Sequence, residues 1–128
     1  MSVTPADLLA LAGSLAAGDD EARWRGAISR CYYAAFHACG AWHDALPMPG
    51  SNAGPAGGVH QELINRLRNP DACVPQAGRD LSKVMAAKLD ALRHQRVQAD
   101  YHLADAMDAV LAANACAHCA EMLNRVAS

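Results

Sequence analysis

The feature that most constrains the fold is a helical spacing of apolar side chains in a chain rich in alanine. Between about residues 20 and 46, apolar side chains recur every 3.6 residues and would lie on one helix face. These residues are Trp24, Ile28, Cys31, Ala35, Ala38 and Trp42. Alanine is the best helix former, and a helix buries such a stripe against its neighbours. The pattern predicts an all-α chain.

Helix-capping signals predict further helices on either side of this one. Thr4 is suited to cap a first helix, because Pro5 follows at the first helical position and Asp7 lies in the first turn. Gly18 ends that helix. Residues 47–58, rich in Pro and Gly, are expected to form a flexible loop. Three further helices are expected: residues 59–68, a helix from a cap at Asp80 through Leu92, and a last helix from Met107 to Val126.

Length and charge restrict the classes of function. The 128 residues are expected to form a single domain, 1–128, and the formal net charge of −2 gives no overall basic field that would attract nucleic acid. No apolar run approaches the ~18 residues that span a membrane, and the N-terminus does not resemble a signal peptide. With five cysteines, an odd number, the sequence predicts a reduced, cytoplasmic protein that does not enter a membrane.

Two short stretches concentrate Arg, Tyr and His. In residues 29–36 and just beyond, Arg30, Tyr33 and His37 would lie opposite the apolar stripe of the long helix. Two interpretations of this face remain open: Arg30 is exposed to solvent, or the face lines a polar cleft. The second stretch, residues 96–102, is expected near the start of the last helical pattern.

In the second stretch, two interpretations compete. Arg93, Arg96 and Asp100 share a helix face, and Arg96 can form an ion pair with Asp100 on a solvated surface. Alternatively, Arg96 holds a phosphate and His102 acts as a general acid or base. On a straight helix these two residues lie about 120° apart. They converge only if the helix breaks near residues 100–102 or if a second subunit contributes.

Other side chains suggest less specific chemistry. Cys116, His118 and Cys119 resemble half a metal site, which Cys31, His37 and Cys39 would have to complete, whereas small buried thiols on a packed helix are the commoner arrangement. His43 and His60 border loops and are expected to be surface residues. The sequence lacks the phosphate-binding loop of P-loop enzymes, the dinucleotide fingerprint GxGxxG and the zinc-protease motif HExxH.

Taken together, the two stretches resemble a known family. Residues 25–38, with the order Ser-Arg-Cys-Tyr-Tyr-Ala-Ala-Phe at their centre, resemble the second-helix signature of HEPN domains (higher eukaryotes and prokaryotes nucleotide-binding). Residues 89–101 resemble the Arg-x-x-Ala-Asp-Tyr element of the same family, and the resemblance covers about residues 4–127. It implies an up-and-down bundle of four to five helices, commonly a homodimer, without a metal or cofactor.

The resemblance implies two kinds of function. One is a metal-independent endoribonuclease or toxin of a toxin–antitoxin or defence module, in which Arg96 and His102 are catalytic and Arg30, Tyr33, Asp100 and Tyr101 bind the substrate. The other is a non-catalytic module that binds a nucleotide, or that acts with a minimal nucleotidyltransferase partner. The second is suggested because Tyr101 stands where the ribonuclease branch often has His. A third interpretation is a structural bundle in which Arg96 and Asp100 form an internal brace.

Overall fold

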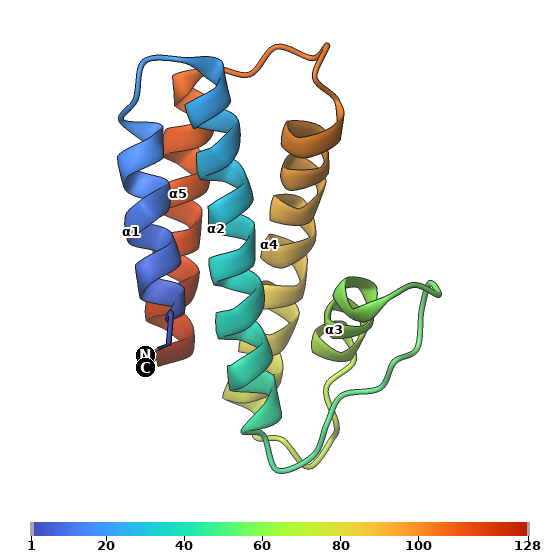
Figure 1. The fold of residues 1–128 in the computed structure, drawn as a ribbon. Coiled ribbons are helices and arrows are strands. Elements are labelled where there is room, and N and C mark those ends of the chain that lie inside the picture. The colour runs from blue at the N-terminus through green and yellow to red at the C-terminus, as the bar shows by residue number, and fades with distance from the viewer. Residues whose placement is uncertain (1, 128) are drawn as a thin grey trace.

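The protein is an all-α helical bundle, as the sequence predicted. A computed structural model describes residues 2–127, and these contain five helices (Figure 1). The helices are α1 (Pro5–Ala16), α2 (Glu21–Asp44), α3 (Val59–Arg68), α4 (Gln76–Tyr101) and α5 (Ala109–Ala127). The four long helices run up and down in turn, and the short α3 lies beside the lower half of α4 (Figure 1).

The long helix α2 lies at the centre of the bundle and packs against α1, α4 and α5. Its predicted apolar stripe is confirmed, because Ile28, Cys31 and Ala35 are fully buried in the core. Tyr32 is also fully buried, although it lies beside the stripe rather than on it. Burial of a large aromatic ring at this point fixes one side of α2 against its neighbours.

The helix starts follow the capping signals, with one exception. Thr4 and Asp7 form a reciprocal capping box at α1, and the Asp20 carboxylate accepts a hydrogen bond from the Arg23 backbone N–H at the start of α2. The predicted cap at Asp80 is wrong, because α4 already begins at Gln76. Asp80 instead accepts a hydrogen bond from the Gln76 side chain at 2.7 Å within the first turn.

The stretch 96–102 lies at the end of α4 and not at the start of the last helix. The helix continues past the predicted stripe to Tyr101, and His102 is its C-cap residue. The last helix α5 begins at Ala109, so that Met107 precedes it. Met107 is nevertheless buried in the core, and its backbone N–H donates to the Glu21 carboxylate at 3.1 Å.

The loop between α2 and α3 is fastened to both helices. His43 Nε2 accepts a hydrogen bond from the Gly50 backbone N–H at 3.0 Å, and Arg66 donates to the Gly50 carbonyl oxygen at 2.7 Å. A Cβ atom at Gly50 would lie 1.9 Å from the Arg66 carbonyl oxygen, so the close approach requires glycine. The expectation of a surface His43 is therefore wrong: the side chain is buried because it closes this loop.

Among the helices of residues 2–127, none is long and apolar enough to cross a membrane.

Candidate functional site

Arg96 projects from the end of α4 onto the side of α2. Its Nη2 donates a hydrogen bond to the Tyr33 hydroxyl oxygen at 2.8 Å, and its Nε lies 3.0 Å from the Asp100 carboxylate. The side chain is only 15% exposed, so the ion pair predicted from the i,i+4 spacing is present and largely shielded from water. Asp100 in turn accepts a hydrogen bond from the Ser29 hydroxyl at 3.3 Å. These contacts hold the guanidinium in a fixed position between two helices.

Aromatic rings surround this guanidinium. Its central carbon lies 5.3 Å from the ring centroid of Tyr33, 5.5 Å from that of Tyr101 and 5.9 Å from that of Tyr32. The central guanidinium carbon of Arg30 also lies near Tyr33, 5.5 Å from its ring centroid. Cations placed over aromatic faces at these distances are attracted by the ring quadrupole. We refer to this group, together with the two residues described next, as the arginine–tyrosine cluster: Arg30, Tyr32, Tyr33, His60, Arg93, Arg96 and Tyr101.

His60 belongs to the cluster through Tyr32. Its Nδ1 lies 2.6 Å from the Tyr32 hydroxyl oxygen, and its ring centroid lies 4.6 Å from that of Phe36. Burial lowers the pKa of His60 below its usual value, and the nearby Arg93 and Arg96 charges lower it further. Burial also raises the pKa of Tyr32 to about 12, which keeps the phenol protonated. The expectation of a plain surface His60 is therefore wrong.

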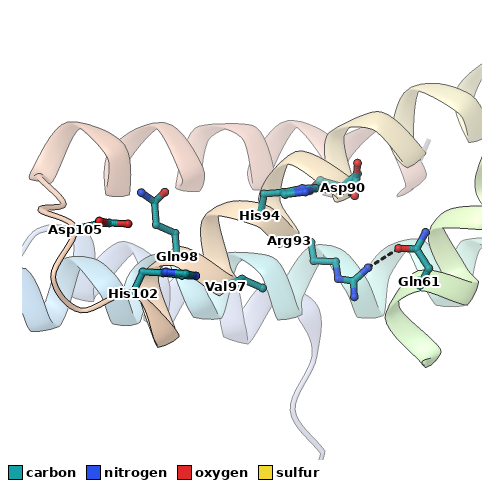
Figure 2. A pocket seen from close by; sticks show the side chains of 8 residues that line it. All are labelled: Gln61, Asp90, Arg93, His94, Val97, Gln98, His102 and Asp105. Carbon is teal, nitrogen blue, oxygen red and sulfur yellow. Dashed lines mark hydrogen bonds and ion pairs between the residues drawn. The ribbon is translucent and has the colours of Figure 1, made fainter. Parts of the chain in front are cut away.

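Arg93 connects the cluster to a groove along α4. Its Nη1 donates to Gln61 Oε1 on α3 at 2.8 Å (Figure 2). The α4 groove has a volume of about 620 Å³. Its lining residues come from α3, α4 and the following loop, and all but Val97 carry a polar side chain: Gln61, Asp90, Arg93, His94, Val97, Gln98, His102 and Asp105 (Figure 2). A groove that combines apolar surface with charged side chains, beside an arginine-rich face, is suited to a ligand with both apolar and anionic parts.

His102 lies in the α4 groove, away from Arg96. Figure 2 shows its side chain beside Gln98 and Asp105 at the far end of the groove from Gln61. Among the described residues no contact joins His102 to Arg96, which faces α2. A break in the helix near residues 100–102 was one of the two conditions under which Arg96 and His102 could meet. The helix does end at Tyr101, but the turn that follows leads His102 into the groove.

Arg25 of α2 holds the C-terminal end of α4 in place by hydrogen bonds. Its buried guanidinium pairs with the Glu21 carboxylate at 2.8 Å. It also donates hydrogen bonds to backbone carbonyl oxygens in the last turn of α4 and the loop beyond: Gln98, Ala99, His102, Leu103 and Asp105. These bonds satisfy carbonyl groups that a helix end leaves unpaired. The positive charge of Arg25 is also stabilised by the negative end of the helix dipole.

Four of the five cysteines form a separate group between α2 and α5, namely Cys31, Cys39, Cys116 and Cys119, whereas Cys73 is exposed in the loop before α4. Cys31 Sγ lies 3.5 Å from Cys116 Sγ, all five cysteines are free, and burial raises the pKa of Cys39 to about 12. Within residues 2–127, no group of three or more His, Cys, Asp or Glu side chains is placed to hold a metal ion. The four thiols between α2 and α5 therefore serve as small packing residues where these helices meet.

The structure brings together most of the residues that the sequence singled out. Five of the six candidate site residues share one face: Arg30, Tyr33, Arg96, Asp100 and Tyr101. The sequence prediction missed His60 and gave Arg93 a place only in the interpretation of a solvated helix face. The one available signal was that Arg93 precedes Arg96 by one helical turn. For His60 there was none, because the direction of α3 depends on the loop before it.

Neither a protein-family model, nor a curated protein, nor a solved structure matches this chain.

Proposed function

We propose that this protein is a HEPN-type module that binds single-stranded RNA or a nucleotide through its phosphate at the arginine–tyrosine cluster. The observation that carries this proposal is the lack of counter-charge. Among the described residues, neither Arg30 nor Arg93 forms an ion pair with a carboxylate, while Arg96 is held beside them. A phosphate group would supply the missing negative charge.

The tyrosines supply the second half of the recognition. Tyr101 is 68% exposed at the edge of the cluster, where a base can stack on its ring. Base stacking on aromatic side chains, combined with arginine contacts to the backbone, is the usual way in which proteins bind single strands. Because the net charge of the chain is −2, binding depends on this local group and not on the overall field. A minimal nucleotidyltransferase is the protein partner that the resemblance to HEPN domains implies.

A second candidate function is metal-independent cleavage of RNA by a homodimeric toxin. It is favoured by the Arg-x5-His spacing of Arg96 and His102 and by the exposure of His102 in the α4 groove. In one chain the two residues face different ways, so cleavage requires the His102 of a second copy at the same phosphate. A general acid or base has to lie within hydrogen-bond distance, about 3 Å, of the atom to or from which it transfers the proton.

Binding and cleavage can be separated with two RNA probes. A 2′-O-methyl oligouridylate cannot be cleaved through its 2′-hydroxyl, so fluorescence anisotropy with this probe measures binding alone. We expect R30A and R96A each to weaken binding at least about fivefold, in the range of a charged contact to phosphate. R125A, which removes an exposed arginine of α5, is the control and should bind like the wild type. Equal affinity for all four proteins contradicts the proposal.

The unmodified oligouridylate, incubated with excess EDTA, tests the second function. Cleavage that is lost in H102A and R96A supports the ribonuclease. Binding without cleavage identifies the non-catalytic module, and pull-down from the native host then tests for the nucleotidyltransferase.

A further inference from the structure

His60 is the one titratable group of the arginine–tyrosine cluster whose charge can change near neutral pH. It projects from the first turn of α3 and contacts two fully or partly buried rings of α2, at 5.5 Å from the Tyr32 centroid and 4.6 Å from that of Phe36. The positive charges of Arg93 and Arg96 on α4 also act on it. An unperturbed imidazole titrates near pH 6.5, within the physiological range. His60 is therefore placed where a bound phosphate would change its charge.

The hydrogen bond to Tyr32 leaves one imidazole nitrogen available for a proton. The Tyr32 phenol stays protonated, and the 2.6 Å contact joins its oxygen to His60 Nδ1. When Nδ1–H donates to this oxygen, Nε2 carries a free lone pair. Protonation at Nε2 keeps the bond to Tyr32 intact, because the imidazolium has a hydrogen on both nitrogens. The site can thus gain a positive charge without rearrangement.

In the empty site, the charges around His60 oppose that proton. From α4, Arg93 and Arg96 are positive, and Asp90 is already paired with Arg68 at 3.7 Å. From α2, His37 adds a further repulsive contribution. A phosphate that neutralises the arginines reverses the balance, since an anion nearby favours the charged imidazole. The remaining ionisable groups of α2 that face this region are Arg30, Tyr32 and Tyr33.

We infer that His60 takes up one proton from solvent when a phosphate occupies the arginine–tyrosine cluster, so that the ligand binds more tightly as the pH falls. This inference rests on the proposed function and adds to it: the charge of the site is set by the pH, and His60 rather than His102 is the histidine that responds to the ligand. By linkage, each unit by which the ligand raises the pKa of His60 corresponds to about a tenfold gain in affinity between high and low pH.

The test measures binding and protonation on the intact protein. Anisotropy with the 2′-O-methyl oligouridylate gives the affinity at about pH 5.5 and about pH 8, which bracket the histidine range. For the wild type we expect binding about tenfold tighter at the lower pH. H60Q should lose most of that difference, whereas H118Q, which replaces an exposed histidine of α5, is the control and should keep it. In parallel, NMR titration of the His60 C2 proton should show a higher pKa in the saturated complex than in the free protein.

The outcomes distinguish this inference from the proposed function. If H60Q keeps the full pH dependence, or if the NMR titration of His60 is unchanged by saturating probe, the inference is wrong even though binding stands. The NMR arm uses the wild type, so it decides the question if H60Q does not fold. If the wild type binds no probe at either pH, the inference and the proposed function both fail.

Discussion

At the scale of single residues, the function of the site depends on how firmly its side chains are held. Tyr32 is fully buried and still has a polar partner, because its hydroxyl meets His60 at the edge of the core. The hydroxyl oxygen of Tyr33 likewise accepts a hydrogen bond from Arg96. Two consecutive tyrosines of α2 thus position one side chain from α3 and one from α4. Preorganised side chains lose less conformational entropy when a ligand binds.

The Tyr32 hydroxyl can be tested by its removal. Y32F leaves the ring in the core but deletes the hydrogen bond to His60, so we expect the protein to lose about 1 kcal/mol of unfolding free energy. Urea denaturation measures this loss. Y101F is the matched control, since the Tyr101 ring is exposed and its hydroxyl forms no hydrogen bond within the described residues. Equal stability of Y32F and Y101F would show that the bond does not contribute.

At the scale of elements, the end of α4 depends on one arginine of α2. The helix-end carbonyl groups point at the Arg25 guanidinium, and Glu21 balances its charge. The same Glu21 carboxylate accepts from the Met107 backbone just before α5. A single ion pair, in which Arg25 is buried and Glu21 is partly exposed, therefore joins the start of α2, the end of α4 and the approach to α5, and it determines where Tyr101 and His102 lie.

Replacement of Arg25 should loosen this junction. R25M keeps much of the side-chain volume but leaves several carbonyl groups and Glu21 without their partner, so we expect a loss of about 2–4 kcal/mol. Hydrogen exchange should accelerate in residues 98–107. R23M is the control, because Arg23 also pairs with an acidic residue of this region, Asp20, but is 54% exposed. A stability loss no larger than that of R23M would contradict this role.

The junction also predicts a pH dependence of stability. The hydrogen bond from Arg25, followed by that from the Met107 backbone, lowers the pKa of Glu21. The unfolded chain then binds a proton more readily than the folded protein, so this contribution is present above the ordinary pKa of 4.5 and is lost as the pH falls. We expect E21Q to be less stable than the wild type near neutral pH and to approach it in acid. Thermal unfolding across pH, with E121Q as control, measures this; a constant difference would contradict it.

Those features of the molecule that are determined by residues close together in the sequence could be predicted, and those that depend on tertiary contacts could not. Caps and periodicity are local, so the helices and the buried stripe of α2 followed from the sequence. The continuation of α4 through Arg96 was missed because its polar last turns lack an apolar stripe. The burial of His43 and the position of His60 depend on the loop at Gly50, whose path is determined by tertiary contacts. Local patterns contain no such information.

At the scale of the whole molecule, charge is distributed unevenly. The chain has more acidic than basic residues, yet three arginines from α2 and α4 gather around tyrosine rings on one face. Elsewhere, four arginines are paired with carboxylates, among them Arg66 with Glu62 and Arg68 with Asp90, whereas Arg79 and Arg125 lie apart from this face and form no ion pair within the described residues. An acidic protein with a locally unbalanced basic face should bind a polyanion through that face and not through its overall charge.

The most direct test of phosphate binding at this face is the salt dependence of affinity. For single strands, the logarithm of the binding constant falls with the logarithm of salt concentration with a slope of about −0.7 for each phosphate contacted. For the 2′-O-methyl oligouridylate, we predict that R30A and R93A each reduce the steepness of this slope by about 0.7, while R125A leaves it unchanged. Slopes that are the same in the wild type, R30A and R93A would contradict phosphate binding at the arginine–tyrosine cluster.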